Sequence, residues 1–367
     1  QVRKAVAASG RKVAALDDDP TGVQTVHDTA VLARWSVDDI ATELQQPSPL
    51  FFILTNSRSL PAAEAVALNA EIVGNLAAAS RQNGVGFAVA SRSDSTLRGH
   101  YPAETDAIAA AVGGVDGVLV CPAFFEGGRY TIDDVHYVRD GDRLVPAAET
   151  EFARDVTFGY RHSDVRQWVE EKTGGRFRAV DVVSLSIADI RVGGPDRVAD
   201  LLTGVTDGRP VVVNAASYAD LSVVALGVLR AEEAGKRFVY RTGASFVRAR
   251  VGMPARPLLT RAELLGVNAP PYLPGFVVVG SHVRRSSEQL ARLLELPHTA
   301  GIEVNVPELL RGDAARDTEV GRVLAETEAA LRAGVTPVVS TSRKVEVASG
   351  GDQLAVSRTV SAALVAI

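Results

Sequence analysis

Three acidic residues in a row, Asp17, Asp18 and Asp19, open the run Asp-Asp-Asp-Pro-Thr-Gly that ends at Gly22. Adjacent carboxylates repel one another, so a row of three suggests a bound cation, a hydroxylated substrate or a proton-transfer step. A helix cap followed by a turn uses the same residue types, since Asp, Thr and Gly all favour such positions. A cap needs only one acid, however, and the run therefore favours a functional site.

Two further clusters combine an arginine with hydroxyl side chains. They are Thr55-Asn56-Ser57-Arg58 and Asp94-Ser95-Thr96-Leu97-Arg98-Gly99-His100. A guanidinium group can grip a carboxylate or phosphate through two hydrogen bonds, so two arginines and a row of acids could hold a hydroxy acid at both ends. A solvated surface position accounts for Arg58 equally well, but less well for Arg98, which stands beside Gly99. His100 is a candidate acid or base, or an ordinary structural histidine.

A fourth cluster is the run Pro122-Ala123-Phe124-Phe125-Glu126-Gly127-Gly128-Arg129. Its two glycines permit unusual backbone angles and a nest of amide groups for an anion, and Arg129 adds positive charge. A plain loop with a stacked phenylalanine pair accounts for the same sequence. Cys121, directly before the run, is expected to be a small buried apolar side chain.

Each cluster follows a short apolar run, directly or after a few residues. These runs are residues 13–16, 51–54, 87–90 and 118–120. They alternate with longer Ala/Leu-rich amphipathic segments such as 61–80, which predicts βαβ units and a mostly parallel sheet. Because an open parallel sheet binds its ligand at the carboxyl ends of its strands, we expect the four clusters to lie together at these carboxyl ends.

The α/β pattern continues with apolar runs at 180–183, 211–214 and 238–240 and helical segments at 187–202 and 218–234. We expect a first domain over residues 1–250 and a connector over 251–274, whose five prolines disfavour a continuous helix. A second α/β unit over 275–367 is expected to contain a buried strand at 276–279, a helix at 286–295 and a strand at 337–340. The loop Gly280-Ser281 between the first two could bind a phosphate at the helix start, although Gly-Ser also begins many ordinary turns.

Composition and absent motifs narrow the function. The 367 residues carry 39 Lys and Arg against 44 Asp and Glu, a net charge of −5, with no polybasic block, which argues against nucleic-acid and anionic-membrane partners. The sequence contains no run of 18 uncharged apolar residues, which is the length that a membrane-spanning helix needs. The one cysteine cannot form a disulfide within the chain, which indicates a reducing cytoplasm. The sequence lacks the motifs of P-loop NTPases, zincins and ordinary α/β-hydrolases. A small-molecule partner is the expectation that remains.

Together, the clusters resemble the four-carbon acid sugar kinase family, whose members phosphorylate threonate, erythronate or 3-oxo-tetronates with ATP. The family's Asp-Asp-x-Thr-Gly turn falls on residues 18–22, its Asp-Ser-Thr-Leu-Arg-Gly run on 94–99 and its Pro-Ala-Phe-x-x-x-Gly-Arg loop on 122–129. Segments 136–142, 149–155 and 240–246 match as well, so the resemblance covers most of the chain. His100 stands where many relatives have Asn.

The resemblance implies an α/β protein of two domains, each with a mostly parallel sheet flanked by helices. The first would bind the sugar acid, the second ATP with Mg²⁺, and the reaction would occur in the cleft between them. Asp18 or Asp19 would orient and deprotonate the terminal hydroxyl, with no choice between the two acids. The residues expected to bind substrate are Thr21, Arg58, Asp94, Ser95, Thr96, Arg98, Gly99, His100 and Arg129, and those expected to bind nucleotide are Gly280 and Ser281. No metal ligands are assigned in the chain, and a homodimer is the default assembly.

The C-terminus departs from the family. Its later Gly-Gly-Asp/Ile-Thr nucleotide loop and final Pro/Gly-rich segment are not found, and Gly350-Gly351-Asp352 lacks the following Thr. The chain begins at Gln1 rather than Met and stops within the helical run 356–367, so we expect both ends to be trimmed and the nucleotide domain to be incomplete. If the protein did end there, a non-catalytic sensor that binds a sugar acid would become a plausible alternative.

The second alternative is a phosphatase resembling the haloacid dehalogenases. Asp17-x-Asp19-x-Thr21 matches the nucleophile loop of that superfamily, and Thr55-Asn56 its second motif. Its mechanism also needs a lysine beside the phosphoryl group and a later acidic pair. Beyond the N-terminus the lysines are Lys172, Lys236 and Lys344, none of which follows a predicted strand in a convincing way.

Overall fold

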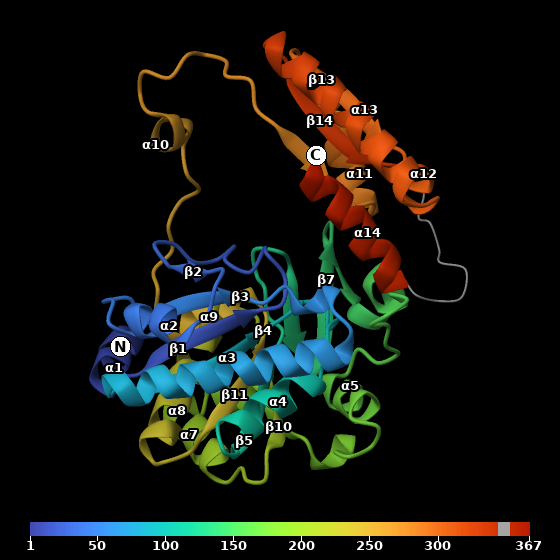
Figure 1. Ribbon diagram of the computed structural model, residues 1–367. Helices are drawn as coiled ribbons and strands as arrows, with labels where there is room; N and C mark the ends of the chain where they lie inside the picture. Colours follow the sequence, from blue (N-terminus) through green and yellow to red (C-terminus); the bar gives the residue numbers. More distant parts are fainter. Residues whose placement is uncertain (344–352) are drawn as a thin grey trace. The chain divides into compact units, whose positions relative to one another are not determined.

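The computed structural model describes residues 1–343 and 353–367, and the chain forms two compact units, Gln1–Arg256 and Pro257–Ile367 (Figure 1). Each unit is built on a parallel sheet with helices packed against it, which confirms the predicted α/β class. Lys344 and the run Gly350-Gly351-Asp352 lie outside the described residues.

Eight parallel strands form the main sheet of the first unit, in the order β2-β3-β1-β4-β11-β5-β10-β9. Their bounds are β1 (Lys12–Asp17), β2 (Val31–Leu32), β3 (Leu50–Leu54), β4 (Phe87–Arg92), β5 (Gly117–Cys121), β9 (Val183–Leu185), β10 (Arg209–Val213) and β11 (Phe238–Thr242). The interior strand β1 is buried along its whole length, which is typical of parallel sheets covered on both faces. The predicted strands 13–16, 51–54, 87–90 and 118–120 are confirmed as β1, β3, β4 and β5.

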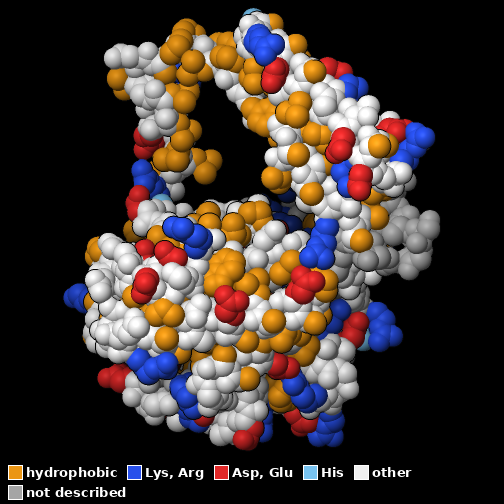
Figure 2. Space-filling model, viewed as in Figure 1, with side chains coloured by type: hydrophobic (Ala, Val, Ile, Leu, Met, Phe, Trp, Pro, Cys, Tyr) orange, Lys and Arg blue, Asp and Glu red, His pale blue; other side chains and the backbone are white. Residues whose placement is uncertain are grey.

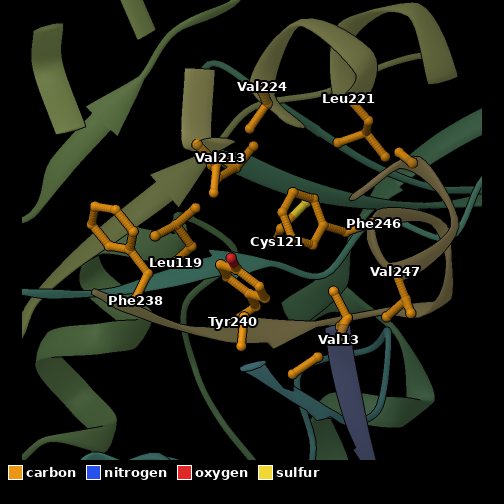
Figure 3. Close-up of a cluster of buried hydrophobic side chains, with 14 of the residues drawn as sticks. Val13, Leu119, Cys121, Val213, Leu221, Val224, Phe238, Tyr240, Phe246 and Val247 are labelled. Atoms are coloured by element: carbon orange, nitrogen blue, oxygen red, sulfur yellow. The ribbon is translucent and has the colours of Figure 1, made fainter. Parts of the chain in front are cut away.

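Helices bury two apolar cores, one on each face of this sheet. The first core joins Ile40, Ile72 and Ile108 of α2 (Val37–Leu44), α3 (Ala62–Asn83) and α4 (Ala103–Ala111) to the sheet. The other core receives side chains from α6 (Ile187–Arg191), α7 (Gly194–Thr203), α8 (Tyr218–Glu233) and α9 (Ala244–Arg250). Figure 3 shows the second core, in which Cys121 lies among apolar side chains, as the sequence predicts. Helix α1 (Val2–Ser9) packs on α8, and α5 (Val165–Lys172) buries Trp168 in a further cluster.

A three-stranded antiparallel sheet is inserted after β5, and the sequence reading did not predict it. It consists of β6 (Arg129–Ile132), β7 (Val135–Asp140) and β8 (Arg143–Pro146). Tight turns join its strands, with positive φ at Asp133, Asp134 and Gly141. Two short 3₁₀ helices, η2 (Ala147–Glu149) and η3 (Glu151–Arg154), lead from it toward α5.

Three predicted elements of the chain differ in the structure. Residues 187–202 form two helices, α6 and α7, because the chain turns at Gly193-Gly194, where Gly194 has a φ of +68°. Residues Ala179–Asp181 form a 3₁₀ helix rather than the start of a strand, and β9 begins at Val183. The strand predicted to be buried at 276–279 is β12 (Val277–Val279), an edge strand whose neighbour Phe276 is 47% exposed.

The second unit contains the three parallel strands β12, β14 (Thr336–Thr341) and β13 (Thr299–Val304), in that order across the sheet. Its helices are α11 (Arg284–Leu294), α12 (Val306–Leu310), α13 (Asp313–Arg332) and α14 (Gln353–Ala366). Their core is built on Val304, Leu309, Val323 and Val339.

The segment that leads into the second unit contains one short helix, α10 (Arg261–Leu265). It exposes Leu258, Leu265 and Val267 among other apolar residues, and Figure 2 shows hydrophobic side chains gathered along this part of the chain. None of the described helices combines the length and the apolarity needed to cross a membrane.

Candidate active site

The carboxyl ends of β1, β3 and β4 carry the first three polar clusters on adjacent strands. The backbone ties these ends together, because the Asp17 carbonyl accepts hydrogen bonds from the amides of Thr55 (2.9 Å) and Asn56 (3.2 Å). The Asp18 amide in turn donates to the Arg92 carbonyl (3.1 Å). The loops after these three strands are therefore held together at the carboxyl ends of the strands, as predicted.

Arg58 joins two of the acidic residues. Its Nη2 and Nε donate to the two carboxylate oxygens of Asp18 at 2.5 and 3.1 Å, and its Nη1 donates to Asp19 Oδ2 at 3.0 Å. The other Asp19 oxygen accepts from the amide (2.8 Å) and hydroxyl (2.5 Å) of Thr21. These contacts lower the pKa of Asp19 against the opposing effect of burial. Arg58 is thus a bidentate partner of Asp18, and the alternative of a solvated surface arginine is wrong.

The Asp94–His100 loop holds a second acid–arginine pair. Arg98 Nε donates to Asp94 Oδ2 at 2.7 Å, and Thr96 donates to the same oxygen. Although burial opposes it, the arginines Arg98 and Arg58 hold the pKa of Asp94 well below its usual range. Gly99 has a φ of +110°, and a Cβ there would lie 3.1 Å from Asp18 Oδ2, so glycine lets this loop lie against Asp18.

Residues 147–160 approach this loop. Arg98 Nη1 lies 3.4 Å from Asp155 Oδ2, and its guanidinium lies 5.2 Å from the centre of the Phe152 ring. Arg129 lies 5.6 Å from the same ring centre and donates to the Gly127 carbonyl. The structure therefore brings the guanidinium groups of Arg98 and Arg129 close to the same aromatic ring, so two positive charges lie at this part of the site.

Two contacts hold the 3₁₀ helix η1 (Ser57–Ser59) that carries Arg58. Ser57 Oγ donates to Glu104 Oε1 (2.5 Å), and His100 Nε2 donates to the Leu60 carbonyl (2.9 Å). Burial and the nearby Asp18 raise the pKa of Glu104. His100 therefore fits the structural role better than the acid or base role. Ser95, similarly, contributes its carbonyl to a 2.7 Å hydrogen bond from His136.

The sequence reading missed three residues of this cluster, and it named a fourth, Asp17, in the acidic run without giving it a role in the kinase. Asp17 and Arg92 end β1 and β4, Arg241 stands one residue before the end of β11, and Glu104 is the second residue of α4. Arg241 Nη2 donates to the Arg98 carbonyl at 2.7 Å. A charged residue at the end of a strand that is otherwise apolar was the available signal, because such a charge is rarely buried unless it is paired.

The cavity of about 660 Å³ that opens beside Lys12 and Met253 is separate from this cluster. Lys12 begins β1 and Asp17 ends it, so the cavity lies at the amino ends of the strands, opposite the acidic cluster. We do not assign it to the site.

In the second unit, Gly280 and Ser281 lie between β12 and α11, as predicted. Arg343, which follows β14, donates through Nη2 to the Ser281 carbonyl (2.6 Å) and to Ser287 Oγ (2.8 Å). Its Nε and Nη1 are buried with no hydrogen-bond partner in the part of the chain that the structure describes. The loop and the start of α11 thus offer backbone amides and a guanidinium group to an anion.

Gly22 allows the acidic turn to close over Asp17. A Cβ at Gly22 would lie 1.7 Å from Asp17 Oδ2, and the Asp17 side chain is too short to move out of the way. We expect Gly22→Ala to displace the turn, to lower the free energy of unfolding by about 1–3 kcal/mol and to reduce any activity of the site, as measured by urea unfolding and turnover. Gly74→Ala in α3, where a Cβ meets nothing within 4 Å, is the control and should be neutral or stabilising. A Gly22→Ala protein as stable and active as the wild type would contradict the close contact.

No group of three or more His, Cys, Asp or Glu side chains is placed to hold a metal ion in residues 1–343 and 353–367. The cluster instead offers carboxylates that can accept a proton or orient a hydroxyl, and guanidinium groups that can bind an anion. Such a set suits transfer of a charged group to a hydroxylated acid.

Comparisons with known proteins identify two domains in the chain. Residues 13–250 match the family model of a sugar-binding N-terminal domain, and residues 276–367 match that of a nucleotide-binding C-terminal domain. A D-threonate kinase from Bordetella bronchiseptica is 36% identical over 154 residues, which cover 40% of this chain and 36% of that protein. The chain therefore aligns with about a third of the length of this relative.

Solved structures share the fold. A domain of unknown function from Bordetella bronchiseptica, crystallised with bound citrate as a domain-swapped dimer, matches with a TM-score of 0.50 and 24% identity over 96% of this chain and 79% of that chain. A protein from Salmonella typhimurium matches with a TM-score of 0.56 and 18% identity over 90% of this chain and 74% of that chain. With both domain models matched in order, the chain belongs to the four-carbon acid sugar kinase family.

Proposed function

We propose that the protein is a kinase that transfers the γ-phosphoryl group of ATP to the terminal hydroxyl of a four-carbon sugar acid such as threonate. The observation that carries this proposal is the Arg58 fork between Asp18 and Asp19, beside the Arg98 loop at the carboxyl edge of the sheet. Phosphoryl transfer needs positioning and charge stabilisation more than covalent help from the protein, and this cluster supplies both. The nucleotide-binding model over residues 276–367 supports ATP as the donor.

The two candidate bases differ in exposure. Both oxygens of Asp18 are held by Arg58, and its side chain is 3% exposed. The Asp19 side chain is 28% exposed. We assign Asp19 as the group that orients the hydroxyl and accepts its proton, because a base must touch the substrate. Asp18 then acts as a positioning residue that fixes Arg58.

In the reaction, the terminal hydroxyl oxygen attacks the γ-phosphorus atom. The new O–P bond forms as the bond from the γ-phosphorus to the β,γ-bridging oxygen breaks, ADP leaves, and the hydroxyl proton passes to Asp19. Mg²⁺ enters as part of the MgATP substrate and partly neutralises the phosphate charge. Gly280, Ser281 and Arg343 are the groups that we propose to hold the nucleotide phosphates.

The substrate carboxylate is assigned to Arg98, with Arg129 beside it at Phe152. We expect Arg98→Lys to raise KM for the sugar acid about tenfold or more while kcat falls less, because an ammonium group cannot reproduce the planar fork. Steady-state kinetics at saturating MgATP give the two constants, and the exposed Arg161→Lys is the control. An unaltered KM would show that Arg98 serves the loop structure instead.

We propose that the protein works in the cytoplasm and forms a homodimer. The single buried cysteine is compatible with a reducing compartment. The Bordetella bronchiseptica protein that was crystallised as a domain-swapped dimer supports a dimer here.

The proposed function is tested by measuring ADP release with MgATP and a panel of D- and L-threonate, D- and L-erythronate and their 3-oxo forms. Turnover on one member would support the kinase and name its substrate. Phosphate release from a phosphorylated sugar acid without nucleotide would instead favour the phosphatase. A phosphatase of this kind needs a lysine beside the acidic turn, and neither Lys172 nor Lys236 meets this need. Lys236 pairs with Asp116, and Lys172 donates to the Gly159 carbonyl, and both partners lie outside the acidic turn.

A further inference from the structure

Arg92 and Asp17 form a buried charged pair at the ends of adjacent strands. They are register partners on β4 and β1, and they are 4% and 1% exposed. The shortest distance between the charged groups, from Arg92 Nη1 to Asp17 Oδ1, is 3.5 Å. Charge-assisted hydrogen bonds are normally about 2.7–2.9 Å long. The two residues are therefore neighbours without a good hydrogen bond between them.

Both side chains keep unused hydrogen-bonding atoms. Asp17 Oδ1 and Arg92 Nε are buried and have no hydrogen-bond partner in the described residues. Buried polar atoms are nearly always paired, because an unpaired one loses its hydrogen bonds to water and gains nothing in return. An arginine cannot escape this cost by losing its proton, so it needs an anion nearby.

Arg250 is a buried arginine whose side chain is well paired. Its Nη2 donates to Glu232 Oε2 at 2.6 Å and its Nε to the Tyr240 hydroxyl at 3.1 Å. Arg58 is likewise held by Asp18 and Asp19. The incomplete pairing of Arg92 thus differs from that of Arg250 and Arg58 and resembles that of Arg241 on the neighbouring strand β11, whose Nε is also buried without a partner in the described residues. Arg92 lies at the carboxyl ends of the strands, where the acidic cluster is.

Asp17 is a poor permanent counter-ion for Arg92. Burial, together with the charges of Asp18 and Asp19 on the same turn, raises the pKa of Asp17 to about 7, although Arg92 on β4 and Arg58 on η1 oppose this rise. The carboxyl group therefore exchanges its proton near neutral pH. When it is protonated, Arg92 loses the charge of the carboxylate with which it forms an ion pair.

The position of Arg92 links it to the part of the cluster that a ligand can reach. Its charge contributes to the lowered pKa of Asp19, which is the more exposed acid. The turn that carries Asp19 also carries Gly22, which lies directly against the Asp17 carboxylate. The buried pair therefore lies in contact with the turn that carries Asp19, the residue to which we assign the substrate hydroxyl.

We propose that Arg92 is an additional anion-binding residue of this site: its guanidinium group binds an oxyanion that a substrate brings, while Asp17 takes up a proton from solvent. The oxyanion is either the carboxylate of the sugar acid, which Arg92 then shares with Arg98, or a phosphate oxygen of the nucleotide, and both suit the same planar fork of donors. The proposal rests on the kinase function, but binding measurements test it without turnover.

Calorimetric titration of the protein with D-threonate alone and with a non-hydrolysable ATP analogue plus Mg²⁺ separates the two sources. We expect Arg92→Gln to weaken one of these ligands by about 10- to 100-fold, as the loss of a hydrogen-bonded charge should, and the ligand affected identifies the anion. Arg191→Gln, which removes the arginine of α6 from its ion pair with Asp220 of α8, is the control. Wild-type affinity of Arg92→Gln for both ligands would overturn the proposal.

Asp17→Asn and the double variant Asp17→Asn/Arg92→Gln distinguish ligand binding from a purely structural pairing. The double variant contains a neutral pair, so it keeps the fold if Arg92→Gln alone does not. If Arg92 binds the ligand, the double variant binds as weakly as Arg92→Gln, and Asp17→Asn binds more tightly than wild type above pH 7 because the competing carboxylate is gone. Wild-type binding by the double variant would show that Arg92 only neutralises Asp17, and would refute the proposal.

Proton uptake on ligand binding is a further test, because it would not occur if Arg92 had only a structural role. A bound anion raises the pKa of Asp17 above its free value of about 7, so binding takes up a proton near and above that pH. The measured enthalpy should therefore depend on the ionisation heat of the buffer in the wild type, but not in Asp17→Asn. Failure of the kinase function looks different: the wild type would bind the sugar acid and transfer no phosphoryl group.

Discussion

Replacing Asp19 with asparagine is expected to lower kcat by about 10²- to 10⁴-fold, the range that a well-placed acid–base group contributes. The amide keeps the size of the side chain and can still accept the Thr21 hydrogen bonds, but it cannot take the hydroxyl proton. Turnover is measured as ADP release at saturating MgATP and sugar acid. Thermal unfolding should change little in comparison, because Asp19 is the more exposed of the two acids that Arg58 holds.

Asp28→Asn is the matched control for this variant. Asp28 follows in the same connection between β1 and β2, but its side chain is 74% exposed and pairs with His27 and Arg256. We expect its kcat to match the wild type. If Asp19→Asn also kept wild-type kcat, Asp19 would be removed from the mechanism and Asp18 would become the candidate base.

Replacing Arg58 with glutamine is expected to destabilise the protein by about 3–5 kcal/mol, because it leaves the Asp18 carboxylate buried without its counter-ion. The free energy of unfolding in urea measures this loss. Turnover should fall as well, since Arg58 also holds Asp19.

The double variant Asp18→Asn/Arg58→Gln separates pairing from packing. It removes both charges, so it should recover much of the free energy of unfolding that Arg58→Gln loses. If the double variant were less stable than Arg58→Gln, the pair would not be the source of the effect. A small loss in Arg58→Gln itself would show that water solvates Asp18.

The sequence predicts the main sheet well because its strands are unbroken apolar runs followed by polar turns. The antiparallel insert was missed since its strands are short and mostly polar on one side, as in β8, where Arg143 and Leu144 are both exposed. The break between α6 and α7 depends on Gly193-Gly194, and isolated glycines in an amphipathic segment do not fix where a helix ends. The exposure of β12 follows from its place at the edge of its sheet, which the sequence does not specify.

The same limit applies to the candidate site. The loops after β1, β3 and β4 could be assigned to one edge because each follows a strand. That Asp17 faces Arg92 depends on the register of β1 against β4, and that Glu104 holds Ser57 depends on how α4 packs. Neither relation is local in the sequence, so residues that act through tertiary contacts were missed.

The most direct test of the proposed kinase is transfer of labelled phosphate from [γ-³²P]ATP to D-threonate, with erythronate and the 3-oxo acids in parallel. The account predicts that label appears in one of these acids in step with ADP, that transfer requires Mg²⁺, and that Asp19→Asn slows it by about 100-fold or more. Absence of label in every acid, from folded protein that binds D-threonate, would contradict the kinase and favour a sensor that only binds the acid.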